Sequence, residues 1–189
     1  MCSMMQASLI LFHLISLNTV TSFTEIEQLA RRDESELCDQ HIPSLHKRCV
    51  SSTEEALIHC GQILRLTRSM SATIRPPWWA GAIYRVALVL WTISLEFGDS
   101  HRMSADAQVV NETYFPIDTH PLQHPAVARY MTDKQGTPVL TRQNGSQMLI
   151  DNPLNILLHC TQVIAEGVPT RFTDGLRLKL SRLARDGSR

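Results

Sequence analysis

Four residues at positions 38–49 are of types that bind zinc. Cys38, His41, His46 and Cys49 follow the order CxxH and then HxxC, and zinc accepts both thiolate and imidazole ligands. Only four residues separate the two pairs, whereas a zinc finger places about a dozen between its ligand pairs. The second pair also lies in a stretch with a helical pattern. We therefore expect no metal site in this chain.

Two histidine–cysteine neighbours offer a base and a nucleophile by residue type. His59 precedes Cys60, and His159 precedes Cys160. Both pairs fall in predicted helices, where adjacent side chains point about 100° apart and do not meet. No other nucleophile or acid–base pair stands at a suitable spacing. The sequence thus predicts no enzyme, no catalytic residue and no cofactor site.

Composition places limits on the function of the chain. The 189 residues carry 18 basic and 18 acidic side chains, so no overall field attracts nucleic acid. Hydrophobic residues make up 43% and charged residues only 19%, below the usual quarter or so, which suggests surface that a partner protein or a missing part of the chain covers. The five cysteines form no paired CxxC motif, which favours a reduced, intracellular protein.

A long apolar segment at 75–97 is the predicted centre of an all-α fold. Pro76 and Pro77 suit a helix start, Gly98 suits its end, and apolar residues occupy nearly every face between them. Such a helix is buried by other helices or by a bilayer. Arg85 in its middle disfavours the bilayer, so we expect the centre of an irregular multi-helix domain.

The N-terminal apolar run at 7–17 leaves two alternatives open. It has the length of a signal-peptide core, but no lysine or arginine precedes it and His13 interrupts it. The other interpretation is a core helix that packs through Leu9, Phe12 and Ile15 or Leu17. Glycosylation sequons at Asn111 and Asn144 bear on the first alternative only.

Further helices are expected at 24–33, at 45–67 with a possible break at the Ser52–Glu55 capping box, and at 126–132. The polar segment 99–125 is expected to be a flexible loop. His101, His120 and His124 lie in it without a cysteine or carboxylate at a firm spacing, so we predict no metal site there. Asn144-Gly145 predicts a β-hairpin with a type I′ turn at 137–150.

Two helices are expected to close the chain. Asp151 or Asn152 caps the first, Pro153 opens it and Gly167 ends it. Its inward residues are expected to be Leu154, Leu157, Leu158, Thr161 and Ile164 or Ala165. Thr173 caps the second, whose apolar stripe consists of leucines. Its other face carries Arg177, Lys179, Arg182 and Arg185. We expect this face to be solvated, because no aromatic residues interleave with its bases as in nucleic-acid surfaces.

Three patches together resemble a known family. They are HCGQILRLTRSM at 59–70, RPPWWAGAIYRVALVLWTISL at 75–95 and GVPTRFTDGLRLKLSRLARD at 167–186. They look like the C-terminal part of the fungal transcription factor regulatory domain. The most similar branch carries Cys/His zinc fingers and a xylanolytic-activator-like regulatory region. The resemblance covers nearly the whole chain in the right order.

The resemblance implies a nuclear, non-catalytic regulatory region that influences transcription by RNA polymerase II and binds protein partners or itself. Zinc and DNA binding would belong to a finger upstream of Met1. We therefore expect residues 1–189 to form a single, partial helical domain of a truncated member, with no membrane contact. A secreted or membrane-associated helical protein is the alternative, based on the N-terminal run and the sequons.

Overall fold

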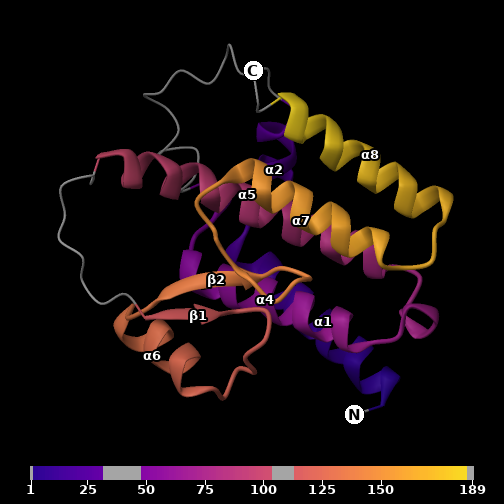
Figure 1. Cartoon of the computed structure of the whole chain (residues 1–189), viewed down its shortest axis with the longest axis horizontal. Coiled ribbons are helices and arrows are strands. Elements are labelled where there is room, and N and C mark those ends of the chain that lie inside the picture. The colour runs from indigo at the N-terminus through magenta and orange to yellow at the C-terminus, as the bar shows by residue number, and fades with distance from the viewer. Residues whose placement is uncertain (1, 32–47, 104–112, 187–189) are drawn as a thin grey trace.

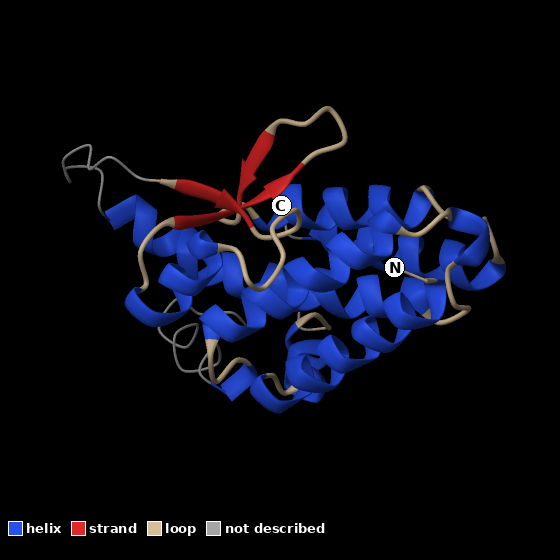
Figure 2. Ribbon diagram, turned by 90° about the horizontal axis from the view of Figure 1, so that it is seen from below, coloured by secondary structure: helices blue, strands red, loops and turns tan. Residues whose placement is uncertain are grey.

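The computed structural model describes residues 2–31, 48–103 and 113–186, and it is mainly α-helical with one small sheet (Figures 1 and 2). This confirms the predicted fold class. The helices are α1 (Ser3–Val20), α2 (Phe23–Leu29), α4 (Thr53–Ser69), α5 (Trp79–Met103), α6 (Pro125–Asp133), α7 (Pro153–Ala165) and α8 (Arg171–Asp186), and a 3-10 turn spans Ala72–Ile74. The strands are β1 (Tyr114–Pro116), β2 (Thr137–Thr141) and β3 (Gln147–Leu149).

Helix α5 is the centre of the fold, as the sequence predicts. It contacts α2, α4, α7 and α8. Its Ile83, Val86, Leu90 and Ile93 are completely buried. The expected end at Gly98 is wrong, because the helix continues to Met103. A glycine inside a helix costs about 1 kcal/mol, which does not by itself end a helix.

Arg85 lies at the edge of the buried face of α5, as expected. Its guanidinium donates a hydrogen bond to the Asn18 side chain at 2.9 Å. The same group lies 4.7 Å from the centre of the Phe23 ring. The charged end therefore bridges α5 to α1 and α2 at the surface, while the stem stays partly covered.

The helix expected at 45–67 is broken before α4. Val50 pairs with Thr21 in an isolated antiparallel bridge, so the chain is extended there. Ser52 occupies the N-cap position of α4, although its hydroxyl makes no capping hydrogen bond. The short helix expected at 24–33 begins one residue early, at Phe23, and its C-cap is Ala30.

Helix α7 is capped as predicted but turns a different face inward. The Asn152 side chain accepts a hydrogen bond from the Asn155 N–H at 3.0 Å. Leu157 and Ile164 are buried, whereas Leu158 is 53% exposed. Leu154 is exposed as well. The inner positions that the prediction missed are Ile156, His159, Cys160 and Val163.

Helix α8 begins earlier than predicted. Thr170 precedes the first turn, and its hydroxyl accepts a hydrogen bond from the Thr173 N–H at 3.1 Å. The Thr173 hydroxyl in turn accepts one from the Thr170 N–H at 2.8 Å. The cap is therefore Thr170, three residues before the expected Thr173, in a reciprocal arrangement like a capping box.

The predicted hairpin exists, and a third strand joins it. β2 pairs antiparallel with β3, and β1 pairs parallel with β2. Figure 2 shows this sheet at one edge of the helical body. The type I′ turn is wrong, because Gly145 has a positive φ but Asn144 does not. The Gly145 N–H donates to the Arg142 carbonyl, and Gly145 itself has the left-handed conformation. This combination matches a type I turn followed by a bulge.

The connection between α5 and α6 is shorter than the expected loop at 99–125. Residues 99–103 extend α5, and residues 114–116 form β1. Phe115, Ile117 and Asp118 are buried, so this part of the segment belongs to the core. Residues 104–112, which include Asn111, lie outside the described residues.

Candidate protein-interaction surface

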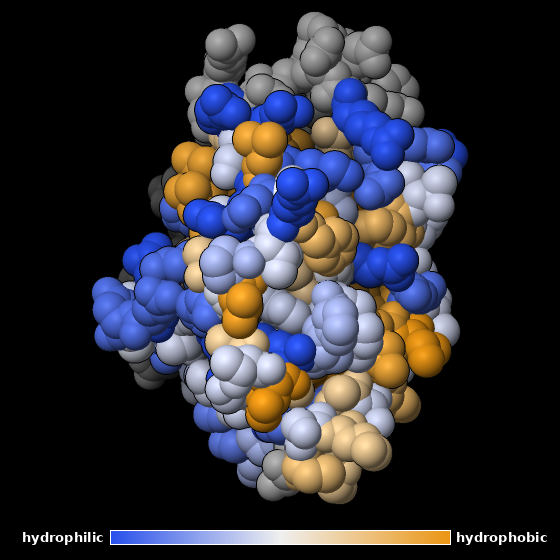
Figure 3. Space-filling model, turned by 90° about the vertical axis from the view of Figure 1, so that its right-hand side faces the viewer, coloured by the Kyte–Doolittle hydropathy of each residue, from blue (hydrophilic) through white to orange (hydrophobic). Residues whose placement is uncertain are grey.

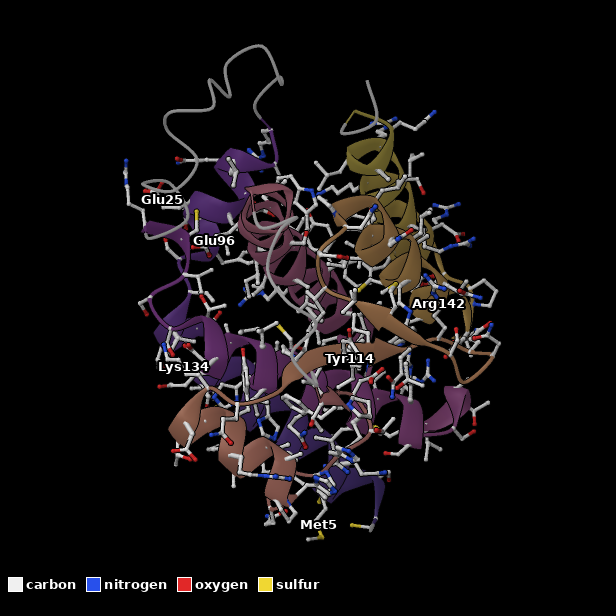
Figure 4. All side chains as sticks on the ribbon, turned by 60° about the vertical axis from the view of Figure 1, so that its left-hand side comes forward. Met5, Glu25, Glu96, Tyr114, Lys134 and Arg142 are labelled. Atoms are coloured by element: carbon white, nitrogen blue, oxygen red, sulfur yellow. The ribbon has the colours of Figure 1, made fainter. Side chains whose placement is uncertain are left out.

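The outer face of α1 carries large apolar side chains that the described part of the chain leaves uncovered. Met5, Leu11, Phe12 and Ile15 are 57%, 45%, 55% and 65% exposed. In Figure 4, Met5 lies at the lower edge of the molecule, on the solvent side of α1. The helix contains no aspartate, glutamate, lysine or arginine. This face is therefore both apolar and uncharged.

The inner face of α1 packs on α4. Ile10 and Leu17 are buried, and His13 lies between them on the same face. The Gln6 amide donates to the Ser69 hydroxyl at 2.9 Å and fixes the start of the helix. The spacing of these four residues, four, three and four, is that of one helical face.

The expected packing face of α1 is wrong in part, because only Leu17 of the predicted residues is buried. Leu9, Phe12 and Ile15 lie on the exposed side. A helix that is apolar all round contains no pattern that distinguishes its faces. The polar contacts of Gln6 and His13 with α4 help to set the rotation, and sequence reasoning gave those residues no role.

The exposed residues of α1 form two stripes with helix-packing periodicity. Met5, Leu9 and Phe12 are spaced four and three apart, and Met4, Leu11 and Ile15 lie seven and four apart. Such spacing suits the insertion of side chains from a second helix between them. Figure 3 shows pale and tan side chains at the bottom of the molecule, near the N-terminus, while orange and blue side chains are mixed higher up.

α1 also has the length and composition of a membrane span. Among the described residues it is the one helix that is long and apolar enough to cross a bilayer. Only 22% of this segment is buried within the structure. The central helix α5, which the sequence raised as a rival span, does not meet the same test.

The two histidine–cysteine pairs lie in α4 and α7, and their cysteines belong to the packed core. Cys60 and Cys160 are completely buried, and burial raises the pKa of the Cys160 thiol to about 12. His59 in α4 faces His13 in α1. A thiol with so high a pKa is a poor nucleophile at neutral pH.

A buried polar cluster surrounds the other histidine. The Arg68 guanidinium donates to the Asp118 carboxylate at 2.5 Å and contacts the ring of His159 at 2.9 Å. The Thr141 N–H and hydroxyl both donate to Asp118. Burial and the neighbouring Arg68 lower the pKa of His159 to about 4. The cluster ties α4 and α7 to the sheet, and sequence reasoning missed Asp118 because it lay in a segment expected to be a loop.

The candidate metal ligands do not come together in the part of the chain that the structure describes. Cys38, His41 and His46 lie outside the described residues, as does the side chain of His101, while Cys49 is buried. The rings of His120 and His124 stack with their centres 3.7 Å apart. Across the described residues, no group of three or more histidine, cysteine, aspartate or glutamate side chains could hold a metal ion.

The basic residues of α8 are at the surface. Arg177, Lys179, Arg182 and Arg185 are exposed, and Arg177 pairs with Asp174 at 3.5 Å. That this face is not a nucleic-acid surface stays a prediction. Leu176 and Leu180 on the opposite side are buried, as expected.

Comparison with known proteins identifies relatives over nearly the whole chain. The sequence is 49% identical to a transcription factor of Zymoseptoria tritici over 98% of the chain. It is 48% identical to Transcription factor 1 of Elsinoe fawcettii over 97% of the chain, and 29% identical to Transcription factor PfmaH of Pestalotiopsis fici over 95%. The chain spans only 20%, 19% and 18% of the lengths of these proteins.

No family model matches the sequence, and no solved structure matches it. The relatives agree with the resemblance carried by the segments at 59–70, 75–95 and 167–186. The chain is therefore homologous, over nearly its whole length, to one segment of fungal transcription factors.

Proposed function

We propose that this chain is a regulatory, non-catalytic region of a fungal transcription factor and that it acts in the nucleus by binding protein. Through that contact it influences transcription by RNA polymerase II. The observation that carries the proposal is the uncharged outer face of α1, with Phe12 and Ile15 more than half exposed. Large contiguous apolar surfaces on soluble proteins usually mark sites of interaction.

The partner that fits this face is an apolar helix of another protein. The two stripes of α1, spaced four and three apart and seven and four apart, suit the insertion of helical side chains, and no charge on α1 opposes an uncharged partner. We assign zinc and sequence-specific DNA binding to parts of the relatives that this chain does not match. The role of the present segment is then contact with protein rather than with DNA.

A reporter assay in fungal cells tests this proposal. The whole chain is fused to an unrelated DNA-binding domain whose operator lies upstream of a reporter gene. We expect the fusion to change reporter output and Phe12→Glu to abolish most of the change. Leu158→Glu on α7 is the matched control, because Leu158 is 53% exposed and Phe12 is 55% exposed.

Equal expression of the fusions is verified by immunoblot. A wild-type fusion without effect on the reporter contradicts the regulatory role. A Phe12→Glu fusion as active as the wild type contradicts the assignment of the site to α1. Loss of activity in both variants alike would show that the effect is not specific to this face.

Membrane association is the second candidate, and the length and apolar composition of α1 favour it. Insertion into a bilayer would separate Ile10 and Leu17 from α4. The free energy that their burial contributes to the stability of the domain would then be lost. Fractionation of tagged cells separates the candidates. We expect the chain in the nuclear fraction, and recovery in carbonate-resistant membranes would favour the second candidate.

A further inference from the structure

A surface pocket lies between α2, α5 and α8, away from α1. Its floor consists of apolar side chains, and its volume is about 200 Å³. For scale, an engineered apolar cavity of about 150 Å³ accommodates benzene. The pocket therefore has room for one aromatic or branched aliphatic side chain. The floor residues are Ala30, Leu88, Leu180 and Leu183.

Tyr84 forms one wall of the pocket, and its ring contacts two neighbouring side chains. The Phe23 ring packs edge-on against it at 6.4 Å, and the Lys179 ammonium lies 5.7 Å from the ring centre. Burial and the neighbouring Glu27 raise the pKa of the Tyr84 hydroxyl, which hydrogen-bonds that carboxylate. These contacts hold the wall of the pocket in place.

The rim of the pocket is positively charged. Arg31, Lys179 and Arg182 line it together with one acidic residue, Glu27, so the net charge of the lining is +2. Glu27 pairs with Arg31 at 3.3 Å. Among the described residues, no carboxylate forms an ion pair with Lys179 or Arg182. Lys179 and Arg182 are both exposed beside the apolar hollow.

We propose that this pocket binds an acidic peptide segment of a partner protein, with one bulky apolar side chain in the hollow and carboxylates against Lys179 and Arg182. Opposite charge at an interface steers encounter and selects the partner. Nucleic acid fits less well, because the floor is apolar and the Tyr84 ring, on which a base would have to stack, already contacts Phe23 and Lys179.

Fluorescence anisotropy with synthetic peptides tests the proposal on the whole chain. The probe is a labelled peptide of glutamates around one phenylalanine. Its two comparison peptides carry glutamine for every glutamate, or alanine for the phenylalanine. We expect both comparison peptides to bind at least about threefold more weakly, and the acidic probe to lose affinity as salt rises.

Two variants locate the site. Lys179→Gln and Arg182→Gln together are expected to weaken binding of the acidic probe by about 2- to 30-fold, the range for two exposed ion pairs. Arg177→Gln is the matched control, since Arg177 lies exposed on the same helix but does not line the pocket. Circular dichroism checks that all variants keep their helical content.

Three results would overturn the proposal. They are equal binding of the glutamine peptide, equal weakening by Arg177→Gln, and no binding of the acidic probe up to about 1 mM. A labelled duplex DNA that outcompetes the acidic peptide at physiological salt would assign the rim to phosphate instead. This measurement does not involve α1, so its failure is independent of the reporter assay.

Discussion

The Nδ1 atoms of His13 in α1 and His59 in α4 lie 3.0 Å apart. One ring donates an N–H to the unprotonated nitrogen of the other, so the accepting ring must be neutral and the hydrogen bond is lost when both rings are protonated. Burial and the neighbouring His59 and Arg65 lower the pKa of His13 to about 4. Burial also lowers the pKa of His59, against the opposing effect of Glu55. This pair joins α1 to the rest of the fold.

Acid is expected to weaken the docking of α1. Because both pKa values are below the unfolded value of about 6.5, the unfolded chain binds more protons. The stabilisation is complete above about pH 6.5 and is lost as the pH falls toward about 4. Urea unfolding curves between pH 7.5 and pH 4 measure it. His159 contributes in the same direction, so the slope alone does not isolate the pair.

The variant His13→Gln measures how much of this pH dependence comes from the His13–His59 pair. We expect its free energy of unfolding to depend less steeply on pH between 6.5 and 4 than that of the wild type. Parallel curves for the two proteins over this range would contradict the proposed role of the histidine contact.

Leu90→Asp should unfold the domain. Leu90 is completely buried in α5, and an unpaired carboxylate there costs several kcal/mol against a typical total stability of about 5–15 kcal/mol. Far-UV circular dichroism with thermal melting measures the loss. Leu158→Asp on the exposed side of α7 is the control and should change the melting temperature little. A wild-type melting curve for Leu90→Asp would show that α5 is not the core.

Gly61→Ala in α4 should destabilise the fold by about 1–3 kcal/mol. An added Cβ would lie only 2.3 Å from the backbone oxygen of Ile117. Gly175→Ala in α8 is the matched control, because its Cβ would meet nothing within 4 Å. Alanine is the better helix former, so this change should stabilise by about 0.5–1 kcal/mol. Chemical denaturation compares them, and equal shifts for both would mean that Ile117 does not pack closely on α4.

Asp118→Ala should cost about 3–5 kcal/mol, since it leaves Arg68 partly buried without its carboxylate. The Thr141 N–H loses its acceptor as well. Glu25→Gln provides the comparison, because the Glu25–Arg48 ion pair is largely exposed and is worth about 0–1 kcal/mol. Urea denaturation of both variants checks the difference. Similar midpoints would indicate that the Asp118 cluster does not stabilise the fold.

Much of the secondary structure could be predicted from local sequence. The apolar run around Leu90 predicts a buried helix, because nothing else in a small domain covers so many apolar faces. Asn152-Pro153 determines the start of α7, and Gly145 marks the hairpin, since caps and left-handed turn residues act over a few positions.

The tertiary structure alone decided which faces meet. On α1, apolar residues surround the helix, so the choice of Ile10 and Leu17 over Phe12 and Ile15 depends on the shape of α4 and on the His13–His59 contact. The third strand and the Asp118 cluster join residues that lie far apart in the chain, and helix periodicity carries no information about such pairings. The exposed apolar face of α1 is likewise defined by what the described residues leave uncovered, because exposure is a property of packing rather than of residue type.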